Sequence, residues 1–317
     1  MRRSLVLLGV IVLCYAYSIL PPLTHLRPST GDRDRWVSYL VQGLDQKGTP
    51  ITEEEALVRV NQAHDVAASD FPRNKTKRVE FVDRALQLFV DTADADVLII
   101  HNSGGWGRTP YTGDRQWGPV EREIQALLEE EGYTAVISSF VRTQSSPLGI
   151  MEEFQELLLC FPTKAKVQSE AVRFVLQARP NLKVLVTGLS QGGAYSNEVL
   201  KQLEANDQVY GIAAGVPFYY CDVDTTKSLV LQNNGRETDA LKDGDAPALV
   251  TSLVKAFLKW AWHGLDGGPL GVGAYYTPPG HRYRWSYPGV AEPITGFIEE
   301  NFPSETPAVS NSQVLSN

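Results

Sequence analysis

The chain of 317 residues is 43% hydrophobic and 21% charged, a composition that suits a globular protein with one sizeable core. Its net charge of −8 and sequence pI near 5.2 argue against nucleic acid as a partner, and no basic stripe occurs along the chain. The three cysteines (Cys14, Cys160 and Cys221) lack metal-binding spacing. Cys160 and Cys221 either pair in an oxidising compartment or stay buried thiols.

An uncharged apolar run from Leu5 to Leu20 follows Arg2 and Arg3. This pattern predicts a signal anchor or a signal peptide over residues 1–25. Because the apolar character continues past the small residues at a candidate cleavage site, we favour a retained single-pass anchor that holds the rest of the chain outside the cytoplasm. Binding to a membrane through this segment is therefore expected, and secretion after cleavage is the alternative.

Residues 26–96 are expected to form a helical extension that packs on the domain after it. A short helix is predicted around 36–44. The stretch Thr52-Glu53-Glu54-Glu55 is a capping box that opens a second helix to about Ala68. A third helix is predicted over about 76–92, with Asn74 as its cap and its apolar residues at helical spacing.

From residue 97 the pattern alternates between short apolar strands and amphipathic helices. Such alternation predicts an α/β domain over 97–302, with a mostly parallel sheet and helices on both of its faces. The polar tail over 303–317 is predicted to be disordered. Strands are expected at 97–100, 135–140, 184–187, 211–216, 228–232 and near 272–276, and helices at 119–132, 148–160, 163–178, after 190, at 247–262 and at 290–300.

The sequence Gly188-Leu189-Ser190-Gln191-Gly192 joins a buried strand to a helix. Strand, Gly-x-Ser-x-Gly and helix form a nucleophile elbow. The serine occupies a turn too sharp for ordinary backbone angles, so that its hydroxyl projects above the end of the sheet, and the glycines let strand and helix cross closely. Ser190 is thus the candidate nucleophile.

A serine hydroxyl needs an imidazole to take its proton and an acid to orient that imidazole. His281 lies after the last predicted strand and before the final helix, where a hydrolase fold holds its base. The acid should follow the strand at 228–232. Asp239 fits best because it comes shortly after a turn glycine and precedes two apolar residues, and the remaining candidates are Asp243, Glu237 and Asp245.

A tetrahedral intermediate also needs two backbone N–H groups aimed at its oxyanion. One is expected from Gln191, the residue after the nucleophile. The other is expected from the glycine-rich loop after the first strand, at Ser103.

From about residue 97 to 302 the chain resembles the α/β-hydrolase superfamily, in particular its esterases and lipases, because Ser190, Asp239 and His281 follow the family order of nucleophile, acid and base. The resemblance implies a serine hydrolase that cleaves a carboxylic ester, small or lipid-like, through an acyl-enzyme on Ser190 without a metal or organic cofactor. Asn102 departs from the family, which usually has glycine there; asparagine tolerates a positive φ better than most residues. The alternatives are a thioesterase or amidase on the same fold and a membrane-tethered binding module without catalysis.

The helix expected over 246–263 is unusually apolar. Two interpretations remain for it: a helix buried against the sheet, and a lid or membrane-facing surface. Aromatic residues near predicted strand ends either line an acyl pocket or belong to the core; they are Trp106, Trp117, Phe218, Tyr219 and Tyr220.

Overall fold

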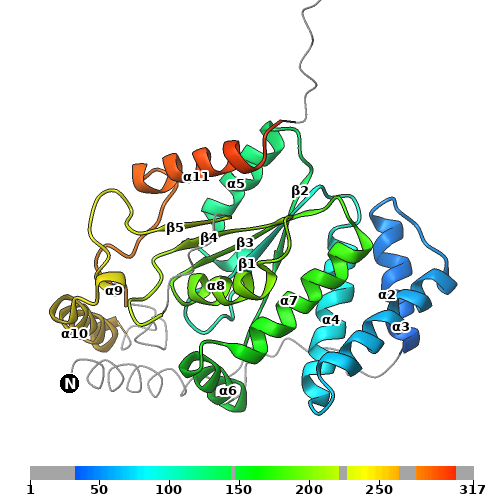
Figure 1. The fold of residues 1–317 in the computed structure, drawn as a ribbon. Coiled ribbons are helices and arrows are strands. Elements are labelled where there is room, and N and C mark those ends of the chain that lie inside the picture. The colour runs from blue at the N-terminus through cyan, green and yellow to red at the C-terminus, as the bar shows by residue number, and fades with distance from the viewer. Residues whose placement is uncertain (1–32, 144–146, 221–226, 264–275, 305–317) are drawn as a thin grey trace, which may run out of the picture.

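The structure, a computed structural model, describes residues 33–143, 147–220, 227–263 and 276–304 (Figure 1). The predicted anchor over 1–25, which contains Cys14, lies outside these ranges, as do Cys221, the candidate partner of Cys160, nearly all of the strand expected near 272–276 and the tail from 305 onward. Within them, no helix is both long and apolar enough to cross a membrane.

Five strands form one sheet in the order β2-β1-β3-β4-β5, and every neighbouring pair is parallel. The predicted parallel sheet is therefore confirmed. The register places Asn102 beside Gly188 and Leu189 beside Ala214, so the carboxyl ends of the three central strands meet at one edge. The strands are β1 (Val97–Asn102), β2 (Ala135–Ser139), β3 (Lys183–Leu189), β4 (Val209–Ala214) and β5 (Ser228–Leu231).

Helices cover both faces of the sheet, as the alternating pattern predicts (Figure 1). In β1, Leu98 and Ile100 pack into one core cluster and Val97 and Ile99 into another, because successive side chains of a strand point to opposite faces. The first cluster includes α4 (Lys75–Asp91), α7 (Pro162–Ala178) and α8 (Gln191–Leu203), and the second includes α5 (Gly118–Glu130) and α11 (Pro288–Asn301).

The N-terminal helices form an outer layer on the first face. Helix α3 (Glu53–Asp70) has the predicted capping box, in which Thr52 Oγ1 accepts from Glu55 N and the Glu55 carboxylate accepts from Thr52 N. Helix α2 (Arg33–Gln46) packs on α3, α3 packs on α4, and α4 contacts α7 (Figure 1). Their buried residues belong to the same core cluster as the sheet face.

Helix α6 (Pro147–Leu158) ends just before α7, which Pro162 opens. Cys160 and Phe161 take φ values of 61° and 57°, so the chain reverses through two left-handed residues. Two short helices were not expected from the sequence: the 3-10 turn η1 (Tyr111–Gly113) and α9 (Ala240–Asp243).

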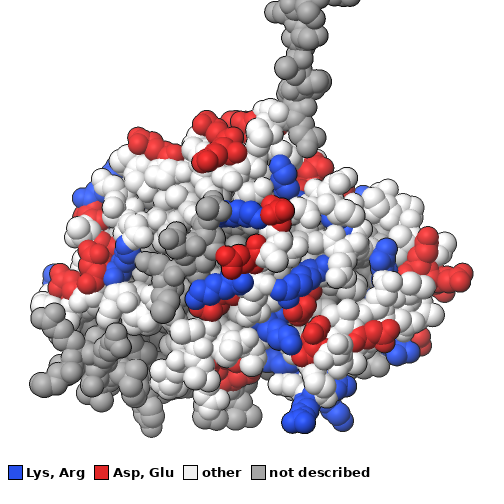
Figure 2. All heavy atoms as spheres, viewed as in Figure 1, with Lys and Arg blue, Asp and Glu red and all other residues white. Residues whose placement is uncertain are grey.

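Helix α10 (Ala246–His263) does not pack as a buried helix. Trp262 is 75% exposed and Leu258 62%, so the interpretation that places this helix against the sheet is wrong. Elsewhere the surface is mixed: on the face shown in Figure 2, acidic and basic side chains of the described residues are interspersed.

Candidate functional site

Ser190 sits on a strained turn between β3 and α8. Its φ and ψ are 60° and −125°, a conformation that L-residues rarely adopt. Its N–H donates to Ala214 O at 2.8 Å, which ties the turn to β4. The side chain is only partly buried. This backbone is what the Gly-x-Ser-x-Gly motif predicts, with the hydroxyl raised beyond the carboxyl edge of the sheet.

The loop after β1 lies directly against this turn. A Cβ at Gly192 would come within 2.0 Å of Asn102 O and 2.7 Å of Ser103 O, which explains why the motif needs glycine there. A Cβ at Gly104 would lie 3.6 Å from Ser190 Cβ. Ser103 and its neighbours are therefore next to the candidate nucleophile.

Asn102 behaves differently from the sequence expectation. Among the described residues, the non-glycine residues with positive φ are Cys160, Phe161 and Ser190, so Asn102 does not use the left-handed conformation. It is the last residue of β1, and its buried side chain donates from Nδ2 to Ser196 Oγ on α8 at 3.0 Å. The residue thus ties the loop to the helix behind the nucleophile.

Asp239 and His281 meet, although they are far apart in the sequence. His281 Nδ1 lies 2.7 Å from Asp239 Oδ2, and both side chains are buried. Burial alone would raise the pKa of Asp239, but the hydrogen bond and charge of His281 outweigh it, so that the pKa lies below its ordinary value. An ionised carboxylate only accepts, so Nδ1 carries a proton, and in the neutral imidazole Nε2 is then the acceptor.

The other three candidates for the catalytic acid lie at the surface. Asp243, Glu237 and Asp245 are all exposed. Asp245 Oδ1 accepts from Ala248 N and caps α10. The geometry therefore singles out Asp239 from this acidic turn.

Two residues that the sequence did not point to hold the acid and the histidine loop together. Tyr283 donates from its hydroxyl to Asp239 Oδ2 at 2.9 Å, the same oxygen that faces His281. Asn234 is 2% exposed, and its Nδ2 donates to Gly280 O and Arg282 O, each at 2.9 Å. Asn234 thus holds the backbone on both sides of His281 through two hydrogen bonds. No short sequence motif predicts either role, because each depends on a hydrogen bond between residues more than forty positions apart in the sequence.

The paired acid and base lie beside the strand that supports Ser190. A Cβ at Gly215 would come within 2.7 Å of His281 Cε1 and 2.9 Å of Asp239 Oδ2. Gly215 follows Ala214, whose carbonyl accepts from Ser190 N. The imidazole therefore packs on the backbone next to the nucleophile, but no hydrogen bond joins Ser190 Oγ to His281 in this structure.

A buried charged cluster holds the loop after β1. Arg142 donates to Ser103 O at 2.9 Å and to Gly105 O at 3.3 Å. Its Nε faces Glu153 at 3.3 Å, and Lys164 Nζ lies 2.6 Å from the same carboxylate. All three side chains are almost completely buried. No sequence pattern predicts this cluster, because its members come from three separate segments.

A second buried network fixes the other side of the loop. His101, at the end of β1, lies 2.7 Å from Glu121 through Nδ1 and 3.2 Å from Thr109 O through Nε2. Thr187 on β3 donates to the other oxygen of Glu121. Burial alone would lower the pKa of His101, but the neighbouring Glu121 outweighs it and the pKa is raised. His101 therefore joins the loop at Thr109 to the buried Glu121 on α5.

The aromatic residues considered for an acyl pocket divide into two groups. Trp117 is fully buried in the core on the α5 side, and Tyr220 is buried on the opposite face. Phe218 and Tyr219 are partly exposed, at 38% and 39%, and lie beyond the end of β4. Among the described residues, no group of three or more His, Cys, Asp and Glu side chains is arranged to hold a metal ion.

Comparison with known proteins gives a likeness of fold alone. No family model matches the chain, and no curated protein matches it. Among solved structures, a Trichoderma reesei cutinase in complex with a phosphonate inhibitor is 19% identical, with a TM-score of 0.34 over 62% of this chain and 82% of that one. A cutinase-like protein from Cryptococcus sp. is 17% identical, with a TM-score of 0.30 over 42% of this chain and 74% of that one. The similarity to a hydrolase fold is loose, and the identity of the reacting groups rests on this chain's own geometry.

Proposed function

We propose that the protein is a serine hydrolase that cleaves a carboxylic ester through an acyl-enzyme on Ser190. The observation that supports this most is the combination of a strained Ser190 backbone with a buried Asp239–His281 pair packed on the neighbouring strand end. A strained, partly exposed serine beside an oriented imidazole is costly to maintain and suits nucleophilic catalysis.

His281 acts as the base in this proposal. Its Nδ1–H is held by Asp239, so Nε2 accepts the Ser190 proton while Oγ attacks the carbonyl carbon of the ester. Because Oγ is not bonded to His281 at rest, rotation of the Ser190 side chain precedes attack. His281 then gives the proton to the leaving alcohol, and later it takes a proton from the water that hydrolyses the acyl-enzyme.

The oxyanion is stabilised by backbone N–H groups. Gln191 opens α8, and the first N–H groups of a helix have no partner within it. The N–H of Ser103 lies on the loop that packs against the elbow. Donors of this kind lower the barrier because they point to where negative charge develops.

The test is covalent labelling of the intact protein with a fluorophosphonate, whose tetrahedral phosphorus requires an activated serine. We expect one label, on Ser190, and hydrolysis of a short-chain ester. Ser190→Ala should abolish both without changing thermal unfolding. Ser169→Ala, a buried serine on α7, is the matched control and should keep the label. Folded protein that neither labels nor hydrolyses any ester would overturn the proposal in favour of a binding module. Cleavage of thioesters or amides in preference to esters would move it to another hydrolase class.

A further inference from the structure

Helix α10 carries a stripe of apolar side chains with large exposed fractions. Five of its large hydrophobic side chains are more than half exposed, and no other helix of the described chain carries as many. Their spacing of four, three, one and four residues places them on one face of the helix. The stripe consists of Val250 (60% exposed), Val254 (53%), Phe257 (53%), Leu258 (62%) and Trp262 (75%).

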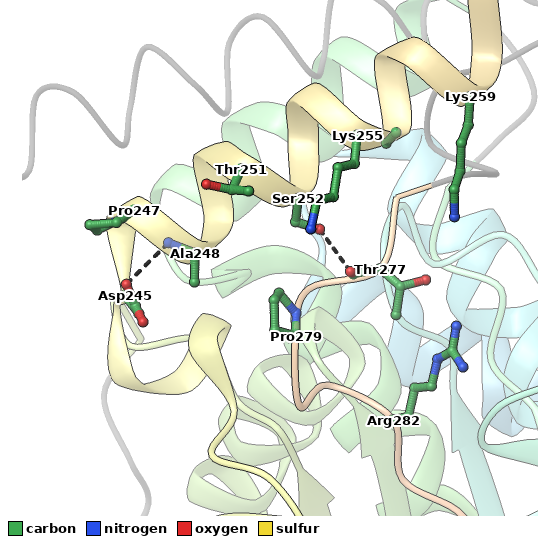
Figure 3. Close-up of a pocket in the computed structure, with 11 residues that line it drawn as sticks. Asp245, Pro247, Ala248, Thr251, Ser252, Lys255, Lys259, Thr277, Pro279 and Arg282 are labelled. Carbon is green, nitrogen blue, oxygen red and sulfur yellow. Dashed lines mark hydrogen bonds between the residues drawn. The ribbon is translucent and has the colours of Figure 1, made fainter. Parts of the chain in front are cut away.

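A cationic edge runs beside the stripe. Lys255 and Lys259 are exposed and line a cavity of about 520 Å³ between α10 and the histidine loop, together with Arg282 (Figure 3). None of the three forms an ion pair with another described residue. The lining of this cavity thus holds three cations and one carboxylate, Asp245, which contrasts with the net charge of −8 of the whole chain.

The helix is attached to both loops of the candidate active site. It starts shortly after Asp239, and Ser252 Oγ donates to Thr277 O at 2.8 Å, which ties it to the histidine loop (Figure 3). At its start, a Cβ on Gly244 would come within 3.0 Å of the ring of Phe218, which follows β4 and is itself part-exposed. The start of α10 therefore lies beside the loop that follows β4.

We propose that α10 docks the protein on an anionic lipid surface, with the apolar stripe in the acyl–headgroup boundary and Lys255, Lys259 and Arg282 on the headgroups. An interfacial helix has aromatic and aliphatic residues on one face and lysines beside them, and this is the pattern of α10. A second copy of the chain is a poorer occupant, because a two-fold contact through the stripe would bring two rows of lysines together. The inference concerns binding and does not depend on the chemistry at Ser190.

Hydrogen exchange of the full-length chain provides a readout that is local to α10, whatever the rest of the chain does at a membrane. Exchange is followed in peptides covering 250–262, first without lipid, then with vesicles of phosphatidylcholine, and then with vesicles of equal parts phosphatidylcholine and phosphatidylglycerol. We expect strong protection with the anionic vesicles and much weaker protection with the neutral ones.

The variants separate charge from apolar contact. Lys255→Gln with Lys259→Gln should lower the docking equilibrium, read from the protection, by about thirtyfold, as expected for two lysines at an anionic surface. Leu258→Ser with Trp262→Ser should remove the protection. The controls are Lys75→Gln with Lys201→Gln, two exposed lysines on other helices, and Leu57→Ser, an exposed leucine on α3. Both controls should leave the protection unchanged.

Three results would overturn the inference. The first is absence of protection with any vesicle. The second is equal protection on neutral and anionic vesicles, because the cationic edge would then have no role. The third is protection without lipid that rises with protein concentration together with a dimer in sedimentation, which would make a second copy the occupant. Ester hydrolysis by Ser190 is measured separately on a soluble ester, and its presence or absence does not bear on these outcomes.

Discussion

The two sides of the candidate active site are held by different kinds of interaction. On the acid–base side, Asp239 and His281 are fixed by short-range polar contacts from Tyr283 and Asn234. On the side of the loop after β1, the backbone of Ser103 is fixed by a buried guanidinium, Arg142, inside a charged cluster. The acid–base side thus uses neutral donors, and the side of the loop after β1 uses a buried charged donor.

The difference follows from what each side has to place. A base needs one tautomer and one ring orientation, and a carboxylate that accepts from Nδ1 supplies both. An oxyanion donor is a main-chain N–H, so its direction is set only by holding the neighbouring carbonyls. Arg142 does this because its planar fork reaches Ser103 O and Gly105 O together, which a lysine cannot do.

The largest expected effect is on the acid–base side. Asp239→Asn should lower kcat for a soluble ester by about 10³- to 10⁴-fold, because the amide no longer stabilises the imidazolium or fixes its tautomer. Asp243→Asn, four residues along the chain and exposed, should change kcat by less than about threefold, the range of ordinary surface changes. A larger loss in Asp243→Asn than in Asp239→Asn would show that the acid has been misassigned.

On the loop side, Arg142→Met should lower kcat by about 10- to 100-fold with little change in KM, because the oxyanion donor is misaligned only in the transition state. The free energy of unfolding should fall by about 2 kcal/mol, since two buried carbonyls lose a charged donor. Lys164 remains to balance Glu153, which limits the cost. Arg142→Lys should recover part of kcat.

The matched control is Arg84→Met. Arg84 is also buried, and it donates to Val141 O at 2.7 Å, one residue from Arg142 but away from the elbow. Its loss should destabilise the protein by a similar amount and leave kcat within about twofold. If both arginine variants keep full kcat, the cluster around Arg142 contributes to stability alone and has no positioning role.

The acid–base side was also the more predictable from sequence. The elbow, the succession of strands and helices along the chain and the loops that carry Asp239 and His281 follow from local patterns: apolar periodicity, glycine spacing and position after a strand. Arg142, Glu153 and Lys164 form no such pattern, because an isolated charge in a sequence is more often solvated than buried. The apolar character of α10 was visible, but whether it faced the core depended on tertiary packing. The contact of Asn102 with Ser196 was not predictable for a similar reason, since it joins residues far apart in the sequence.

The smallest expected effect sharpens the comparison through pH. Tyr283→Phe removes one donor from Asp239 Oδ2 but leaves His281 in place, so kcat should fall by only a few-fold and stability at pH 7 by about 1 kcal/mol.

The hydroxyl of Tyr283 helps to hold the pKa of Asp239 below its ordinary value. A carboxyl with a depressed pKa contributes stability that is present above its unfolded pKa of about 3.9 and is lost as the pH falls through the folded pKa. The difference between wild type and Tyr283→Phe should therefore shrink as the pH falls below about 3.9 and through the depressed folded pKa of Asp239, where the native carboxyl becomes protonated. Tyr195→Phe is the matched control, because the buried Tyr195 hydroxyl donates to the neutral carbonyl of Lys164 at 2.9 Å. Its cost, measured by urea unfolding at each pH, should stay constant over the same range. If the stability lost in Tyr283→Phe is equally independent of pH, the ionisation of Asp239 does not contribute to the stability of the acid–base side.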